Sequence, residues 1–276
     1  MKQFVGLVTI WAACSWVSAQ APAPLDIRWS DAEPLTWSGI AAGEPAGGTA
    51  SFLYPAPNAG GLIAAILTHS LLVNGSRESE RQDRQRLADQ ALNPFRAAIE
   101  GLDSSLLTHD LRARWVSDNA GNGNERRLVH LLPHFRISAD HRVIVLNVRI
   151  RVQEPDAAPD RHVFDQMVQV VSTPHGGEEP LTAWLANDAH HFREEVVSML
   201  GHAIDIALKL GPLPPSSPAR TQRYIYGTET RMERGQPLAS RCGRVVLWTL
   251  RESWMSVPVT HSDPMPCASG YAVAKP

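Results

Sequence analysis

An alternation of apolar and polar side chains across residues 128–173 constrains the fold more than any other feature of this sequence. Successive side chains of a β-strand point to opposite faces of a sheet, so the alternation predicts strands with one buried face and one solvated face. Polar turns divide the region into three such runs, which predicts a meander of three antiparallel strands. The runs are residues 128–138, 142–153 and 164–173.

The register of the first two strands follows from their apolar residues. With residues 139–140 as the loop, Phe135 lies opposite Ile144, and every apolar side chain meets an apolar partner. A slip of one residue would turn the apolar side chains of one strand to the wrong face. The remaining pairs expected from this register are Leu131 with Val148, Val129 with Ile150, and His130 with Arg149.

The polar face of the meander is rich in basic side chains and is the first candidate functional site. Pairing Val152 with Phe164 places Arg151 beside Asp165, an exposed ion pair that supports the register more than the stability. Such a face predicts binding of an anionic ligand or of a partner protein, and the alternative is a face that is solvated or covered by helices. A metal is disfavoured there because the arginines repel cations. The residues of this predicted binding face are His130, His134, Arg136, Arg149 and Arg151.

Composition divides the chain into five segments and predicts an α+β fold. We expect an antiparallel meander with helices packed on one face, followed by a β-rich C-terminal segment. A Pro- and Ser-rich stretch before that segment predicts a linker. The expected segments are a signal peptide (1–19), a Pro/Gly/Ala-rich N-terminal arm (20–59), an α+β core domain (60–211), the linker (212–221) and the β-rich segment (222–276).

Apolar residues at helical spacing predict helices on both sides of the meander in the sequence. The run 60–73 is apolar nearly all round, which favours a buried core helix, and the alternative is a segment that lies at a membrane interface. Trp29 and Trp37 are expected to tie the N-terminal arm to the body, and the alternative is that they stack on a ligand. The other expected helices are 77–86, 87–102, 105–116 and 181–210, and the expected C-terminal strands are 222–226, 244–250 and 254–260.

The N-terminus has the parts of an export signal. Lys2 precedes the short apolar core 4–11, and small residues before the end of the signal predict cleavage after Ala19. The apolar core is too short for a permanent membrane span, so we expect no transmembrane helix in the mature chain. In the alternative interpretation residues 11–14 are a lipobox, and the protein is an outer-membrane lipoprotein lipidated at Cys14. With the signal cleaved after Ala19, we expect a periplasmic or secreted protein.

The three cysteines agree with export. Once Cys14 is removed or lipidated, Cys242 and Cys267 remain as a pair in an oxidising compartment, which predicts a disulfide that closes a C-terminal loop. The chain-entropy model gives such a loop a stabilisation of about 3 kcal/mol. The alternative is two free thiols that serve chemistry.

A second candidate site lies on the predicted helix 181–210. His190 and His191 precede Glu194 and Glu195 at the i, i+4 spacing, so that two ligands of a metal could meet on one face of the helix. The sequence has no His-Glu-x-x-His and no Cys-x-x-Cys motif, and a structural zinc needs four ligands. The alternative is an exposed polar face of the helix.

The common catalytic and nucleic-acid-binding patterns are missing from the sequence. There is no Gly-x-Ser-x-Gly elbow, no Ser-x-x-Lys and no phosphate-binding loop, and we assign no catalytic residue and no cofactor. A net charge of −2 gives no electrostatic argument for nucleic acid. We expect an exported, non-catalytic protein of the cell envelope that binds an envelope protein or an anionic ligand. The alternative function is an exported hydrolase, assisted by a metal at the histidine pair.

The layout of the chain also indicates a resemblance: it consists of an apolar helix, a charged helix, a meander, a long helix and a β-rich tail. It resembles uncharacterised exported proteins of GC-rich Gram-negative bacteria, with which it shares fragments such as Leu53-Tyr54-Pro55 and Ser256-Val257-Pro258. The resemblance agrees with export and assigns no functional residue.

Overall fold

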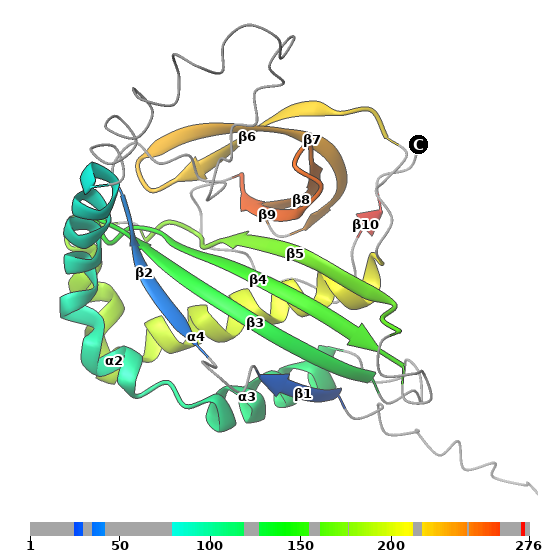
Figure 1. The fold of residues 1–276 in the computed structure, drawn as a ribbon, viewed down its shortest axis with the longest axis horizontal. Helices are drawn as coiled ribbons and strands as arrows, with labels where there is room; N and C mark the ends of the chain where they lie inside the picture. The colour runs from blue at the N-terminus through cyan, green and yellow to red at the C-terminus, as the bar shows by residue number, and fades with distance from the viewer. Residues whose placement is uncertain are drawn as a thin grey trace, which may run out of the picture.

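The computed structural model of the protein describes residues 25–29, 35–41, 79–118, 127–154, 161–175, 177–211, 217–241, 243–259 and 272–273. In these parts of the chain the strands form one mixed sheet of ten strands, in the order β1-β3-β4-β5-β9-β8-β7-β10, with β2 also paired to β3 and β6 to β7. Helices cover one face of this sheet (Figure 1), which confirms the predicted α+β fold. The predicted signal peptide with Ala19, the lipobox at Cys14, the apolar run 60–73 and both Cys242 and Cys267 lie outside the described residues.

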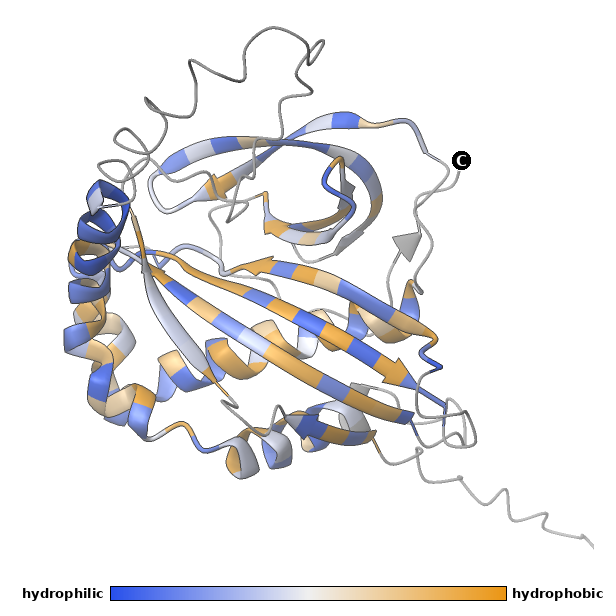
Figure 2. Ribbon diagram, in the orientation of Figure 1, coloured by the Kyte–Doolittle hydropathy of each residue, from blue (hydrophilic) through white to orange (hydrophobic). Residues whose placement is uncertain are grey.

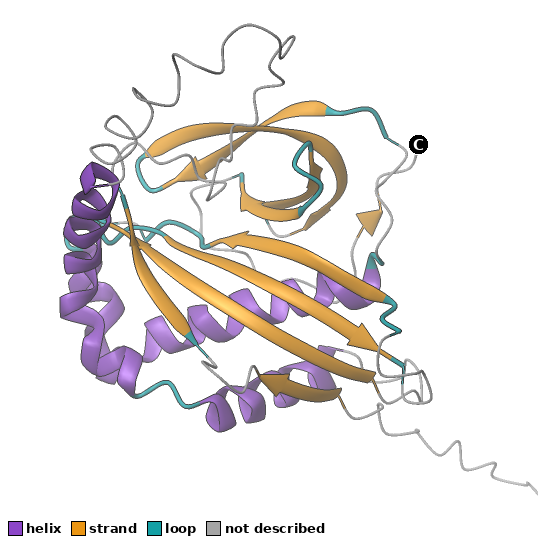
Figure 3. Cartoon of the chain, viewed as in Figure 1, coloured by secondary structure: helices purple, strands orange, loops and turns teal. Residues whose placement is uncertain are grey.

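The predicted meander is the centre of the sheet (Figure 3). Its strands are β3 (Arg127–Ser138), β4 (Ile144–Gln153) and β5 (Phe164–Val171), and they pair antiparallel in chain order. Val152 lies opposite Phe164, and Arg151 opposite Asp165, as predicted.

The register of β3 with β4 differs from the predicted one by two residues. Phe135 pairs with Leu146 rather than Ile144, because the loop spans four residues, 139–142, rather than two. Side-chain hydrogen bonds stabilise this longer turn. The hydroxyl of Ser138 accepts a hydrogen bond from the N–H of Val143 at 3.0 Å and donates one to Asp140 Oδ1 at 2.6 Å. A shift by two residues leaves every side chain on its expected face. The other corrected pairs are Leu131 with Ile150, Val129 with Val152, and His130 with Arg151 in place of Arg149.

Two short strands of the N-terminal arm extend the sheet beside β3. They are β1 (Leu25–Trp29) and β2 (Thr36–Ile40), and both run parallel to β3. Trp29 donates its indole N–H to Thr108 Oγ1 at 2.7 Å, and Trp37 stacks on Phe135 with ring centroids 4.6 Å apart. These contacts tie the arm to the body, as expected of the two tryptophans.

The helices lie on the face of the meander that carries its apolar side chains (Figure 1). After helical residues 79–89, the chain forms the 3-10 helix η1 (Gln90–Phe95), α2 (Arg96–Glu100), α3 (Ser104–Asp118) and, after the meander, α4 (Pro180–Lys209). Asp103 caps α3 by accepting from the N–H of Ser105 at 3.0 Å, as its position predicts. The fully buried side chains between helices and sheet include Phe95, Leu107, Phe135, Leu146, Ile150, Val168, Phe192, Val196 and Leu200.

Helix α4 is interrupted in its second turn, where the sequence predicts a continuous helix. Ala186 is extended, and residues 187–189 have positive φ angles of 52°, 55° and 58°. Asn and Asp adopt this left-handed conformation more readily than most residues do. On the N-terminal side of the break, Trp184 is buried and donates its indole N–H to the carbonyl of His141 at 2.7 Å. The apolar spacing continues across the break because Leu185 also packs on the core.

The C-terminal strands continue the same sheet rather than forming a separate one. They are β6 (Arg220–Tyr226), β7 (Glu229–Arg241), β8 (Arg244–Thr249), β9 (Trp254–Pro258) and the short β10 (Ala272–Val273). β9 pairs parallel with residues 168–170 of β5, and the strands then curl over the face of the meander that the helices leave free. A second core results there, formed by Val145, Val171, Tyr224, Tyr226, Leu247, Met255 and Val257.

A close approach of β2 to the helical layer gives a prediction for stability. A Cβ atom on Gly39 would collide with the backbone of Ala88 and Asp89, whereas one on Gly101 would make only ordinary contacts. We expect Gly39→Ala to lower the free energy of unfolding by about 2 kcal/mol or more. Gly101→Ala, the control, should change it by less than about 1 kcal/mol. Urea unfolding of both variants checks this, and equal midpoints would contradict the packing described.

Candidate functional site

Part of the sheet face opposite the helices is exposed to solvent, because the C-terminal strands cover only one end of it. Outward-facing side chains of β3, β4 and β5 form rows across the strands there, and the hydropathy of these strands alternates along each of them (Figure 2). We call this surface the open face. Its rows are His130–Arg151–Asp165, Leu132–Arg149–Met167 and the pair His134–Asn147.

Two apolar side chains of the middle row are unusually exposed. Leu132 is 54% exposed and Met167 is 44% exposed, and Arg149 lies directly between them. A sheet face that only met water would gain nothing from apolar side chains at these positions, and exposed apolar residues that cluster with charged ones are typical of binding surfaces. The middle row is therefore an indication of a docking site.

The basic side chains of the open face share one carboxylate. Arg149 donates to Asp165 through Nε at 2.7 Å and through Nη2 at 3.1 Å, and Arg151 Nε lies 3.3 Å from Asp165 Oδ2. The hydrogen bonds from Arg149 hold the pKa of Asp165 below its ordinary value, against the effect of partial burial. Two cations against one anion leave this cluster with a net positive charge at neutral pH.

His130 is the titratable group of the first row. Partial burial lowers its pKa, and the positive charges of Arg28 and Arg151 lower it further, while Asp26 opposes them. His162 acts in the same direction as the arginines. Because the ordinary value is 6.5, His130 is neutral at pH 7 and the positive charge of the open face comes from its arginines.

The predicted binding face is thus brought together except at one residue. His130, His134, Arg149 and Arg151 lie on the open face, and His134 Nε2 is 2.8 Å from the hydroxyl of Ser38. Arg136 is only 7% exposed and donates to the carbonyl of Gly39 at 3.4 Å, beneath the covered end of the sheet. Its position follows from β2, which the sequence pattern did not indicate.

Sequence reasoning missed the apolar part of this site. Leu132 has the parity of the polar residues of β3, and Met167 has the parity of Asp165 on β5. An apolar residue out of phase on β3 and another on β5, the two strands that flank β4, was the signal that could have revealed the row. Only the pairing of the strands shows that the two flank Arg149.

The second predicted site is not assembled as a metal centre. His190 Nε2 lies 3.2 Å from Glu194 Oε1 and His191 Nδ1 lies 3.6 Å from Glu194 Oε2, all with more than half of each side chain exposed. Glu195 lies elsewhere, where its carboxylate accepts a hydrogen bond from the backbone of Thr173. Among the described residues, no group of three or more His, Cys, Asp or Glu side chains is placed to hold a metal ion.

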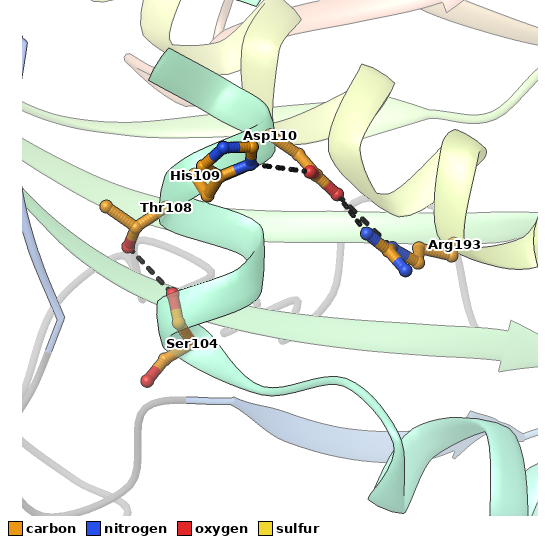
Figure 4. A network of polar contacts seen from close by, with 5 residues as sticks. All are labelled: Ser104, Thr108, His109, Asp110 and Arg193. Atoms are coloured by element: carbon orange, nitrogen blue, oxygen red, sulfur yellow. Dashed lines mark hydrogen bonds and ion pairs between the residues drawn. The ribbon is translucent and has the colours of Figure 1, made fainter. Parts of the chain in front are cut away.

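A polar network between α3 and α4 has a structural explanation (Figure 4). Arg193 donates to Asp110 Oδ2 at 2.6 Å and 3.2 Å, and His109 Nδ1 lies 3.3 Å from the other carboxylate oxygen. Burial is the largest single influence and raises the pKa of Asp110, but the hydrogen bonds and charges of Arg193 and His109 together outweigh it and hold that pKa below the ordinary value. The pair fixes α3 against α4, and the nearby hydroxyl of Thr108 bonds the carbonyl of Ser104 at 2.7 Å.

A hollow between β1, α3 and α4 is too small for a ligand. Leu25, Leu111, Arg114 and Gly201 are among the residues that line it, and it has room for roughly one water molecule. A surface therefore explains binding better than this cavity does.

Comparisons with known proteins do not add to these observations. No protein-family model matches the chain, and no curated protein and no solved structure matches it either. Within the described ranges, no helix has both the length and the hydrophobicity that crossing a bilayer requires. The functional argument therefore rests on the open face.

Glu195, whose side chain is partly buried, predicts a pH dependence of stability. Burial raises its pKa above the ordinary 4.5, while the charges of Arg244 and Arg114 and the Thr173 hydrogen bond oppose the rise. The folded protein then keeps a proton that the unfolded chain has lost, so this group's contribution to the free energy of unfolding falls as pH rises from 4.5 to the folded pKa. Glu195→Gln removes that loss and keeps the shape of the side chain.

We expect Glu195→Gln to be more stable than the native protein above the folded pKa and to lack this decline. Urea unfolding across a series of pH values measures both. Glu100→Gln is the matched control, because it removes one carboxyl from an exposed position of α2 and should not produce the same gain in stability. Parallel profiles for Glu195→Gln and the native protein would show that the carboxyl ionises normally.

Proposed function

We propose that the protein is an exported, non-catalytic binding protein of the cell envelope, and that its open face docks an acidic, partly apolar segment of a partner protein. The observation that carries the proposal is the row Leu132–Arg149–Met167, in which two exposed apolar side chains flank a guanidinium. Export is supported by the sequence of the N-terminus and by the even pair of cysteines Cys242 and Cys267.

The charge of the open face selects the partner. Arg149 and Arg151 share the single carboxylate of Asp165, so an incoming acidic side chain meets a net positive cluster. Leu132 and Met167 supply apolar area on both sides of that cluster. A protein segment that carries acidic and apolar residues satisfies both, whereas a small inorganic anion would leave the apolar side chains in water.

The alternative functions have less support. A metal-assisted hydrolase would need His190, His191, Glu194 and Glu195 at one site, and Glu195 points to Thr173 instead. The lipoprotein alternative depends on Cys14 and changes the location of the protein more than its mechanism. It is compatible with binding through the open face.

A titration with a defined peptide tests the proposal. The probe is the synthetic peptide Glu-Leu-Glu-Glu-Leu-Glu, and the readout is the shift of backbone amide signals in NMR spectra of the protein. We expect the largest shifts at residues 130–134, 147–151 and 165–167. The variant Leu132→Ser/Met167→Ser should weaken binding about tenfold through loss of apolar contact.

A second variant separates specific docking from general charge. Arg149→Met/Arg151→Met should also weaken peptide binding, whereas Arg223→Met/Arg234→Met removes as much positive charge from a distant hairpin and should not. If both arginine variants lost affinity equally, or if the shifts lay outside the open face, the proposal would be wrong. Intact mass of the exported protein decides between cleavage after Ala19 and acylation of Cys14.

A further inference from the structure

The hairpin of β6 and β7 sorts its charged side chains between its two faces. Residues directly opposite each other in an antiparallel pair lie on the same face of the sheet. Both glutamates of the hairpin fall on one face, and two arginines fall on the other without an acidic neighbour. The inner pairs are Gln222–Glu233, Tyr224–Arg231 and Tyr226–Glu229, and the outer pairs are Thr221–Arg234, Arg223–Met232 and Ile225–Thr230.

The inner face of the hairpin belongs to the fold. Tyr224 and Tyr226 are buried in the second core, and burial raises the pKa of Tyr224 to about 12. Glu229 pairs with Arg231 at 3.3 Å, and Glu233 pairs with Arg251 of the β8–β9 turn at 2.5 Å. Both acidic side chains of the hairpin therefore have an arginine partner, with Glu233 16% exposed and Glu229 67% exposed.

The outer face is exposed at Thr221, Arg223, Met232 and Arg234, whereas Ile225, nearer the end of the hairpin, is only 8% exposed. Arg223 and Arg234 are exposed, and neither side chain forms an ion pair or hydrogen bond with another described residue. Met232 is 65% exposed and Leu250 is 63% exposed, the two highest values among the exposed large apolar residues of the described chain. The N–H of Leu250 donates to the carbonyl of Arg234 at 3.2 Å, so Leu250 extends this surface.

We call this surface the hairpin patch. It consists of Thr221, Arg223, Met232, Arg234 and Leu250. It lies on the far side of the meander from α4 (Figure 1), and it shares no residue with the open face. Unlike the open face, it contains no acidic side chain and no histidine. The acidic residue next to the patch in the chain is Glu233, which lies between Met232 and Arg234, belongs to the other face of the hairpin and pairs with Arg251.

We propose that the hairpin patch docks the protein on the surface of a bilayer that contains anionic lipids. A bilayer interface offers phosphate groups beside hydrocarbon at every point, so arginines can bind head groups while Met232 and Leu250 enter the acyl boundary. The patch has the two chemical features that this surface requires, on the β6–β7 hairpin and on Leu250 of the β8–β9 turn beside it. Attachment is reversible, because two arginines and two apolar side chains form a small footprint.

The orientation that results agrees with the rest of the molecule. The hairpin of β6 and β7 lies on the far side of the meander from α4 (Figure 1). Of its two glutamates, Glu233 is 16% exposed and pairs with Arg251, and Glu229 pairs with Arg231 near the end of the hairpin. The open face, on other strands, keeps its own residues for a protein partner.

Vesicle sedimentation tests the inference. The full chain carrying Cys14→Ser, which removes any lipid anchor, is mixed with vesicles of phosphatidylcholine alone or of phosphatidylcholine with phosphatidylglycerol. We expect binding to the mixed vesicles only, weakened by added salt. Arg223→Gln and Arg234→Gln should each lower the partition coefficient about fivefold. Met232→Ser/Leu250→Ser should lower it as well, with the charge unchanged.

The matched control is Arg149→Met/Arg151→Met, which removes two arginines from the open face and should leave vesicle binding unchanged. Circular dichroism checks that each variant is folded, which we expect because the substituted positions are on the surface. Equal binding to both kinds of vesicle, or unchanged binding of Arg223→Gln/Arg234→Gln, would overturn the inference. The inference would also be overturned if the protein did not bind vesicles but bound polyglutamate at the hairpin patch. That result would make the partner an acidic protein. None of these results bears on the open face.

Discussion

The pairing of β3 with β4 determines the rest of this structure. It buries the apolar side chains of both strands under the helices and leaves the polar ones on the opposite face. A strand has a side-chain period of two, so this single ladder fixes at once the core and the surface that remains for binding. The helices, the N-terminal strands and the C-terminal strands are all placed against it.

Both surfaces that we assign to function lie where the fold leaves a sheet uncovered. The C-terminal strands curl over one end of the meander and seal it with a second core, which leaves the row Leu132–Arg149–Met167 in solvent. The same curl turns the outer side of β6 and β7 away from the body. One surface combines arginines with a carboxylate and histidines, and the other combines arginines with apolar side chains alone. That difference in chemistry is the basis for assigning a protein partner to the first and an anionic bilayer to the second.

The sequence predicted those parts of the fold that depend on side-chain alternation. It identified the meander, the faces of its strands and the pairing of Val152 with Phe164. It did not predict the length of the β3–β4 loop, since side-chain hydrogen bonds of Ser138 and Asp140 sustain a longer turn than the apolar pattern requires. β7 was missed because its first half is charged on both faces, and β2 because Gly39 reads as a loop residue until the helix packed against it is known. For the site, four of five predicted residues came together, and the apolar pair beside them needed the register.

The register of β3 with β4 is the claim on which the account depends most directly, and NMR can measure it. The N–H of Ser138 donates to the carbonyl of Val143, and hydrogen-bonded pairs alternate along an antiparallel ladder, so Leu131 and Ile150 form a non-hydrogen-bonded pair. Their Cα atoms then lie about 4.5 Å apart, close enough for a strong nuclear Overhauser effect between the two Hα protons. We expect that signal. A signal between the Hα protons of Leu131 and Val148 instead would place Asn147 beside Leu132, dissolve the row on the open face, and contradict the account.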